Sequence, residues 1–280
     1  KTQIAAYTLL DSLAKVYPDV LSGILSEEVT SSLMNIVGSC IGDQDGESSA
    51  RMEALSFVSA VCKSSNLDAM ETFVQALLPQ IFAAMNDKYY KIVVHALDAC
   101  ASLVRVLRRD ETSVVSPENA AHIKSLLDAV LNKLGSADED QEVKEAAIHA
   151  CAVILAQLND HVDAQDQSRA LGLLLERSRN DATRLAAVRA VTMVAGSSRA
   201  LDFSAVVASM AKEFTTFLRK ANKSLREGAL LALCALVASH ESALQDQDVH
   251  PIVVESSALV CEDDLHLATL AVSLLASIAS

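Results

Sequence analysis

Apolar residues recur along this chain at the spacing that places them on one face of an α-helix. Ile148, for example, is followed at three, six and seven positions by Cys151, Ile154 and Leu155. The same spacing of small or apolar side chains follows five other apolar residues. We call the six residues that begin these stretches the leading residues; they are Leu55, Leu97, Ile148, Val188, Leu230 and Leu270.

The leading residues recur with the period of a helix pair. They are separated by 42, 51, 40, 42 and 40 positions, and an insertion over residues 110–116 accounts for the one long interval. A period of about 40 residues is typical of stacked helix pairs. Between the leading stretches, the sequence predicts further helices over residues 67–86, 117–134, 162–178, 204–221 and 246–261.

These helix pairs predict an all-α fold, a HEAT-repeat α-solenoid with an armadillo-like superhelix of about seven antiparallel pairs. Proline inside a first helix, as at Pro79 and Pro251, and an acid before a second helix are typical of such repeats. We expect one solenoid segment over residues 1–280. Its first repeat is partial, at 1–17, and the others lie at 24–64, 67–109, 117–159, 162–198, 204–241 and 246–280.

Residues at the expected helix starts agree with this division. Pro117 follows Ser116 in a position that suits the first turn of a helix. The chain begins without Met and inside a helical pattern, and its first and last helices would each have an apolar face without a neighbour. We therefore expect a piece of a longer protein. The acids that precede second helices, near the positive end of the helix dipole, are Asp45, Asp87, Asp140, Asp181 and Asp264.

Composition narrows the class of partner. The chain is 51% hydrophobic and has a formal net charge of −13, so polyanions such as nucleic acids and anionic membrane surfaces are disfavoured and a basic protein is favoured. No apolar run reaches the roughly 18 residues of a membrane span. The six cysteines contain no CxxC pair, and we expect them to be small core residues with free thiols, as in a reducing compartment.

The sequence contains no set of residues that predicts an enzyme, a cofactor site or a metal site. No GxSxG, GxxxxGK[ST], GxGxxG, HExxH or EF-hand motif is present, and the seven histidines are scattered over different repeats. The acid cluster, Asp138, Glu139, Asp140 and Glu142, can be interpreted as a divalent-ion site. Solvated turn acids are the favoured interpretation, because no glycine-containing loop of calcium-binding spacing frames the cluster.

A column of cations precedes the leading residues by four positions, and Lys91 departs from that register. One interpretation is a structural ladder in which each cation bonds the turn carboxylate or carbonyls of the next layer. The other is a stripe that binds a partner. The column consists of Arg51, Lys144, Arg184, Arg226 and His266.

Tyr89 and Tyr90 at a predicted turn also have two interpretations, an exposed pair that anchors a partner or a pair in which one ring packs inward. The residues we consider candidates for partner binding are Tyr89, Tyr90, Asp138, Glu139, Asp140, Glu142, Arg184, Lys220, Arg226 and Asp263.

Several short runs, in order and across several repeats, resemble the cullin-associated, neddylation-dissociated proteins. The resemblance covers roughly residues 70–235, and outside it the chain resembles the family only as generic helix pairs. The runs that carry it are Val74–Leu77 with Pro79, Tyr90–Ile92, Asp140–Glu145 with Ala147 and Ile148, Leu175–Arg177, Asn180, Thr183–Leu185, Ala195–Ser197 and Phe217–Lys220.

The resemblance implies the central segment of a long solenoid that winds round an unneddylated cullin and its RING subunit. Proteins of this family act as exchange factors for substrate-receptor adaptors, without catalysis. This chain would be the arch between the two ends that grip the cullin, in contact with the N-terminal and C-terminal parts of the same solenoid. The implied location is cytoplasmic and nuclear.

Other functions fit the same helix pairs. A nuclear transport receptor of the importin type is also built from such pairs, and its acidic inner surface takes basic cargo. A scaffold that arranges a phosphatase or a kinase would need a separate catalytic chain. An enzyme is the alternative that the sequence supports least.

Overall fold

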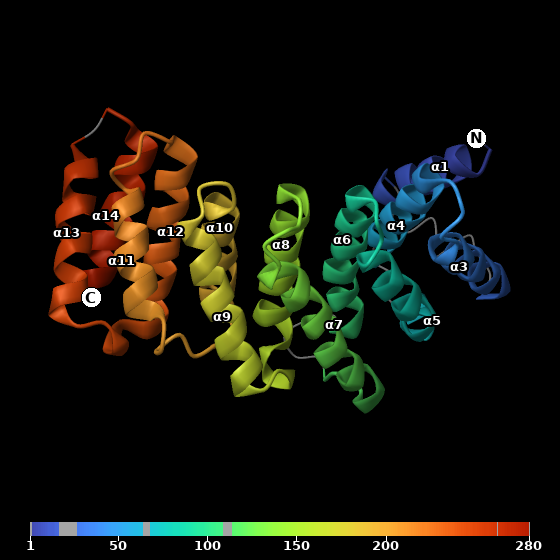
Figure 1. Ribbon diagram of the computed structural model, residues 1–280. Helices are drawn as coiled ribbons and strands as arrows, with labels where there is room; N and C mark the ends of the chain where they lie inside the picture. The colour runs from blue at the N-terminus through green and yellow to red at the C-terminus, as the bar shows by residue number, and fades with distance from the viewer. Residues whose placement is uncertain (1, 17–26, 64–67, 109–113, 262, 280) are drawn as a thin grey trace. The chain divides into compact units, whose positions relative to one another are not determined.

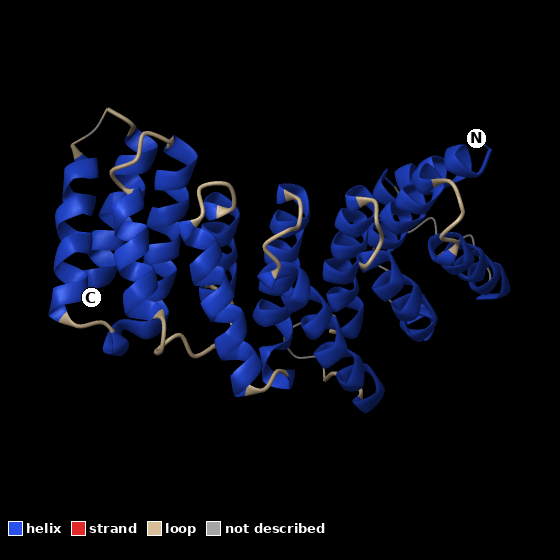
Figure 2. Cartoon of the chain, in the orientation of Figure 1, coloured by secondary structure: helices blue, strands red, loops and turns tan. Residues whose placement is uncertain are grey.

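The computed structural model describes residues 2–16, 27–63, 68–108, 114–261 and 263–279. Within these ranges every regular element is a helix, and no strand is present (Figure 2). This confirms the all-α fold class. The α-helices are α1 (Thr2–Val16), α3 (Glu27–Gly42), α4 (Ser48–Lys63), α5 (Asp68–Met85), α6 (Tyr90–Leu107), α7 (Pro117–Gly135), α8 (Gln141–Leu158), α9 (Ala164–Arg179), α10 (Arg184–Ala195), α11 (Val207–Phe217), α12 (Lys223–His240), α13 (Asp246–Val260) and α14 (Leu265–Ala279).

The helices expected between the leading stretches are present, and one is shorter than predicted. We expected a helix over residues 204–221, whereas α11 spans Val207–Phe217. The carbonyl of Phe203 accepts the N–H groups of both Val206 and Val207 at 2.8 Å, so the chain enters α11 through a tight turn. It leaves through another, because the N–H of Leu218 bonds the carbonyl of Thr215 only three residues back, at 3.2 Å.

The chain divides into two compact units, Lys1–Ala150 and Cys151–Ser280, with the border inside α8. In the N-terminal unit, α1, α4 and α6 lie side by side in one layer, and α3 and α5 lie in a second (Figure 1). Each helix of the second layer packs against the helix that follows it, α3 on α4 and α5 on α6. These are the antiparallel pairs that the period predicts.

The C-terminal unit repeats this arrangement. Its second helices, α10, α12 and α14, form one layer, and α9, α11 and α13 form the other (Figure 1). Three intra-repeat pairs result, α9 with α10, α11 with α12, and α13 with α14. The turns that join the two helices of a pair therefore line one edge of the unit, and that edge positions the candidate residues considered below.

The leading residues occupy the core in five of six cases, because Leu55, Leu97, Ile148, Val188 and Leu230 are fully buried. Leu270 is only half-buried, so this part of the prediction is wrong. In α12 the first backbone hydrogen bond to span four residues runs from the N–H of Arg226 to the carbonyl of Asn222. In α14 the equivalent bond runs from the N–H of Ala268 to the carbonyl of Asp264, so equivalent positions of the two helices are 42 residues apart. Val272 is therefore the counterpart of Leu230, but its side chain is exposed, and the buried face of α14 consists of Leu267, Ala271 and Leu274.

The expectation that the cysteines are core residues is confirmed for Cys62, Cys100 and Cys151. Burial raises the pKa of each of these thiols to about 12, so they stay neutral at physiological pH. Cys40 and Cys234 are half-buried. The expectation is wrong for Cys261, which is exposed where the chain leaves α13.

Side chains at the helix starts agree with the sequence signals in three repeats. Ser116 accepts the N–H of Asn119 at 3.2 Å, with Pro117 in the first helical position. Asp87 and Asp264 also accept N–H groups two residues on. Asp181 does not; Asn180 accepts the N–H of Ala182 at 3.0 Å instead. None of the helices among the described residues has the length and hydropathy to cross a membrane.

Two helical glycines generate a matched pair of predictions. A Cβ on Gly172, exposed in α9, would meet no atom within 4 Å, whereas a Cβ on Gly228 in α12 would lie 3.3 Å from a side-chain methyl of Val188. Alanine is favoured over glycine in a helix interior by about 0.5–1 kcal/mol. We expect Gly172→Ala to raise the free energy of unfolding by about that amount, measured by urea denaturation.

Gly228→Ala should stabilise the chain less than Gly172→Ala, or destabilise it, because the helix α10 must give way to the added methyl. Equal gains in the two variants would contradict the close approach of α10 and α12.

Candidate functional site

The cation column is defined by the backbone of the second helices. In four repeats, the first N–H to bond four residues back belongs to a column cation: Arg51 to Glu47, Lys144 to Asp140, Arg184 to Asn180 and Arg226 to Asn222. In α6 this position belongs to Val93, so the departure of Lys91 from the register is confirmed. In α14 it belongs to Ala268, so His266 is not a member of the column.

Three of these cations fold back onto backbone carbonyls at the end of the preceding helix or in the turn that follows it. Arg51 Nε donates to the carbonyl of Ile41 at 3.1 Å, and Lys144 Nζ to that of Ala137 at 2.7 Å. Arg184 donates to the carbonyls of Ser178 and Arg179, both at 3.2 Å. The last carbonyls of a helix have no intrahelical donor and carry partial negative charge. Each cation therefore fastens the turn within its own repeat.

The ladder interpretation is confirmed for one member of the column. Arg51 Nη1 lies 2.7 Å from a carboxylate oxygen of Asp87 in the next repeat, with both side chains largely buried. Burial would raise the pKa of Asp87, but the N–H of Tyr89 and the Arg51 guanidinium lower it below its usual value. Lys144 bonds a carbonyl of its own repeat, and Arg184 bonds two carbonyls and the Asp181 carboxylate of its own repeat, so neither reaches the next layer as the ladder requires. The contact of Arg184 with the next repeat is the Phe217 ring, 4.9 Å from the guanidinium carbon.

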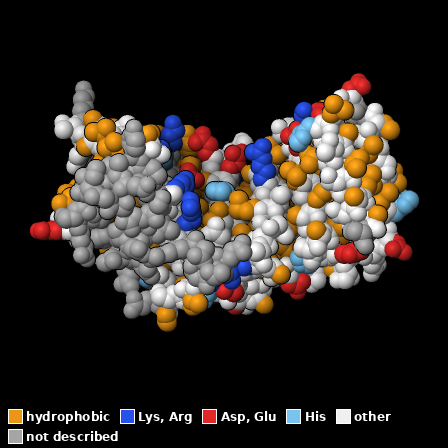
Figure 3. Space-filling model, turned by 180° about the vertical axis from the view of Figure 1, so that it is seen from behind, with side chains coloured by type: hydrophobic (Ala, Val, Ile, Leu, Met, Phe, Trp, Pro, Cys, Tyr) orange, Lys and Arg blue, Asp and Glu red, His pale blue; other side chains and the backbone are white. Residues whose placement is uncertain are grey.

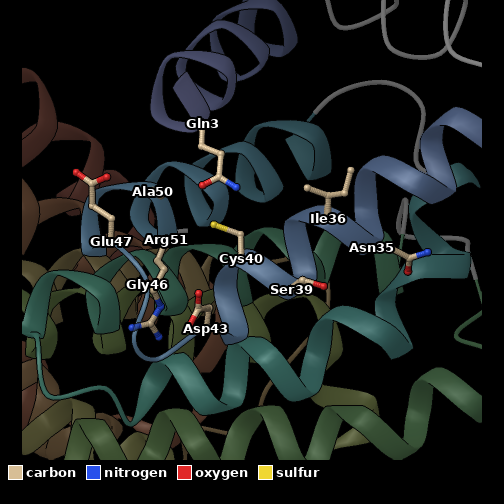
Figure 4. A pocket seen from close by; sticks show the side chains of 10 residues that line it. All are labelled: Gln3, Asn35, Ile36, Ser39, Cys40, Asp43, Gly46, Glu47, Ala50 and Arg51. Carbon is tan, nitrogen blue, oxygen red and sulfur yellow. The ribbon is translucent and has the colours of Figure 1, made fainter. Parts of the chain in front are cut away.

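Arg51 also lines a cavity of about 370 Å³ between α1, α3 and α4, shown in Figure 4. The Cys40 thiol faces this space, together with Asp43 and Gln3. Burial raises the pKa of the Cys40 thiol, although the nearby Tyr7 hydroxyl and the charge of Arg51 oppose the shift. The thiol is therefore a poor nucleophile. The guanidinium is already bound to Ile41 and Asp87.

The acid cluster lies at the turn before α8. Asp138, Asp140 and Glu142 are exposed, and Glu139 is half-buried with an oxygen 2.7 Å from Lys133 Nζ. Among the described residues, no group of three or more histidines, cysteines and acids is arranged to hold a metal ion. The cluster has the geometry of solvated turn acids.

The tyrosine pair lies at the start of α6. The rings of Tyr89 and Tyr90 meet edge to face with centroids 5.7 Å apart, and Lys91 Nζ lies 5.9 Å from the Tyr90 centroid. Tyr89 is exposed and Tyr90 is half-buried. Tyr89 is thus the ring most open to a partner.

The remaining candidates lie on the turn edge of the C-terminal unit. Lys220 and Asp263 are exposed, and Arg226 is half-buried beside Asn222. They belong to the C-terminal unit, whereas the acid cluster before α8 and the tyrosines belong to the N-terminal unit.

Sequence reasoning missed a set of ion pairs between successive repeats. Arg219 binds Glu255 with two nitrogens, one at 2.7 Å, and Lys223 Nζ lies 2.6 Å from Asp264. The hydrogen bond with Arg219 lowers the pKa of the Glu255 carboxyl, and that with Lys223 lowers the pKa of Asp264. A signal was available, because opposite charges recur here at separations close to one repeat.

Arg184 allows the structural and binding roles of the column to be separated. Arg184→Ala removes bonds to two carbonyls and the contact with Phe217, and we expect it to lower the free energy of unfolding by about 1–3 kcal/mol. Arg189→Ala, an exposed cation on the same helix, is the control and should leave the melting curve nearly unchanged. An unaltered melting curve for Arg184→Ala would contradict the fastening role.

Comparison with known proteins identifies relatives over nearly the whole chain. Residues 23–151 match the model of a family described as CAND1-like, TPR repeats. The chain is 32% identical over 98% of its length to Cullin-associated NEDD8-dissociated protein 1 of Arabidopsis thaliana. It is 35% identical over 99% of its length to Cullin-associated NEDD8-dissociated protein 2 of Rattus norvegicus. It spans 22% and 21% of these relatives, about a fifth of their length.

Solved structures support the fold class. A computationally designed armadillo repeat protein superposes with a TM-score of 0.63 at 17% identity, over 88% of this chain and 99% of the designed one. Importin beta superposes with a TM-score of 0.62 at 13% identity, over 98% of this chain and 33% of that protein. At such identities the likeness is one of fold alone, a stack of helix pairs.

The order of the matching runs, the helix-pair layers and the relatives aligned from end to end agree with one another. The chain, which corresponds to about a fifth of the length of these relatives, belongs to the family of the cullin-associated NEDD8-dissociated proteins.

Proposed function

We propose that this chain is the middle segment of a non-catalytic regulator that wraps an unneddylated cullin and its RING subunit and promotes exchange of substrate-receptor adaptors. The observation that carries the proposal is the alignment of relatives named cullin-associated over 98% and 99% of the chain. On this proposal the protein acts in the cytoplasm and the nucleus, and the flanking parts of the same solenoid continue the surface.

The described surfaces suit a large protein partner better than a small substrate. Exchange requires a protein that binds the free and the adaptor-bound cullin unequally, since only differential affinity shifts an equilibrium. Layers whose turns are fastened by Arg51, Lys144 and Arg184 can hold such a surface in a defined shape. The cavity between α1, α3 and α4 offers a neutral thiol and a guanidinium bound elsewhere, which supports a role without catalysis.

A binding measurement tests the proposal directly. The purified chain is immobilised, and an unneddylated cullin–RING pair, its neddylated form and an unrelated basic protein are passed over it. We expect retention of the unneddylated pair and weaker retention of the neddylated one. Retention of the basic protein alone, with release by a GTP-bound small GTPase, would instead favour a transport receptor.

The acid cluster generates a second test. Asp138 and Asp140 are exposed, so Asp138→Lys with Asp140→Lys should leave the fold intact, whereas Glu139 is kept because it holds Lys133. If the cluster faces basic residues of the cullin pair, we expect affinity to fall roughly 3- to 10-fold and its dependence on salt to decrease.

The matched control is Asp45→Lys with Glu241→Lys, which changes the net charge equally at exposed positions elsewhere. An equal loss in both double variants would mean that only the overall charge matters. Unchanged affinity and salt dependence in the first would remove the cluster from the interface.

A further inference from the structure

Positive charge is concentrated in two turns of this acidic chain. The stretches 177–184 and 217–226 contain seven cations and one acid, Asp181, although the whole chain has a net charge of −13. These stretches join α9 to α10 and α11 to α12, so they occupy neighbouring positions on the turn edge of the C-terminal unit (Figure 1). The seven cations are Arg177, Arg179, Arg184, Arg219, Lys220, Lys223 and Arg226.

The layer of α10, α12 and α14 in the same unit has a different surface. Seen from behind, the face formed by α10, α12 and α14 shows mainly hydrophobic and neutral side chains, with charged ones towards its edges (Figure 3). Exposed apolar residues on that layer include Met193, Leu231 and Val272. Most of the unit's cations thus lie in these two turns and on α11.

In three ion pairs that α11 or the turn after it forms with a neighbouring repeat, the cation is the more exposed partner. The Arg219 side chain is 72% exposed and that of Glu255 is 14% exposed. The Lys223 side chain is 54% exposed, and that of its partner Asp264 is 26% exposed. Arg179 follows the same pattern over Glu213. The carboxylates therefore lie beneath, and the N–H donors project into solvent.

Two further lysines on this surface have no acidic partner among the described residues. Lys220 is exposed directly after Arg219, and Lys212 is exposed two turns earlier on α11. Lys212, Thr216 and Arg219 line one wall of a groove of about 500 Å³, and α13 forms the other wall with Gln247 and Pro251. Asp248 also lines the groove, but its carboxylate accepts the N–H of Gln245 in the cap of α13.

We propose that this surface binds an acidic segment of a protein partner along α11. We call it the α11 ridge; it consists of Arg179, Lys212, Arg219, Lys220 and Lys223. Guanidinium groups bind carboxylates with two parallel hydrogen bonds, and Arg219 already holds Glu255 in this way at the base of the ridge. Carboxylates of the partner meet the outward donors and the two unpaired ammonium groups.

A protein segment fits the ridge better than a nucleic acid does. A nucleic-acid duplex is longer than the surface that these five cations cover. The neighbouring stretch 241–264 carries seven acids and no lysine or arginine. A long polyanion would meet that negative surface, whereas a short acidic segment contacts the ridge alone. Exposed pairs of this kind mainly set association rate and specificity.

The ridge can be tested with a fluorescein-labelled hexaglutamate peptide and the complete chain, by fluorescence anisotropy at low and physiological salt. We expect binding that weakens with salt and falls roughly fivefold or more in Lys212→Glu with Lys220→Glu. Because neither lysine has a partner to lose, the thermal melting curve should stay unchanged. The control is Lys88→Glu with Lys91→Glu, an equal change of charge at exposed lysines of the N-terminal unit, which should bind as the parent does.

Three outcomes would overturn the proposal: no binding of hexaglutamate by the parent chain, equal weakening in both double variants, or tighter binding of a short duplex DNA that is lost only in the ridge variant. The peptide contains no part of a cullin, so these results are independent of the retention of a cullin–RING pair. The two proposals can therefore fail separately.

Discussion

The structure depends on the burial of each helix pair against the pairs before and after it in the chain. Each helix has a single apolar face, with Leu55, Leu97, Val188 and Leu230 fully buried at equivalent positions of their repeats. Because the neighbours of each layer are set by chain order, the turns of successive repeats fall along one edge of each unit. Polar chemistry accumulates on that edge, since the turns are where the chain leaves the apolar interior.

The turns are fastened by cations as well as by packing. Arg51, Lys144 and Arg184 each occupy the first fully helical position of a second helix. Arg51 and Arg184 bond carbonyls at the end of the first helix, and Lys144 bonds a carbonyl in the turn between the two helices. One side chain thus satisfies the helix end and fixes the angle between the two helices of a pair. A binding surface made of several turns keeps its shape only if each turn is held in this way.

Charge is distributed differently in the two units. The N-terminal unit carries the acid cluster at the start of α8. In the C-terminal unit, the cations of the α11 ridge are more exposed than the carboxylates they pair with. A partner that contacts both units would need basic and acidic surfaces of its own. Such a division of charge fixes the orientation of a long interface more strongly than a uniformly negative surface would.

The sequence by itself determined the fold class, the helix pairs and most of the core. The 3.6-residue pattern and the 40-residue period are local properties, and each leading stretch carries its own copy. The family could also be predicted, because short runs such as Asp140–Glu145 lie in a fixed order.

Only the tertiary structure decided which groups meet across repeats. The register of α14 depends on where its first backbone bond forms, at Asp264, and this bond excludes His266 from the column. Under the ladder interpretation Arg184 would bond the carboxylate or carbonyls of the next repeat, whereas it bonds carbonyls of its own. Whether Arg219 or Glu255 faces solvent depends on the depth of each side chain between α11 and α13, and a linear pattern of charges carries no information about depth.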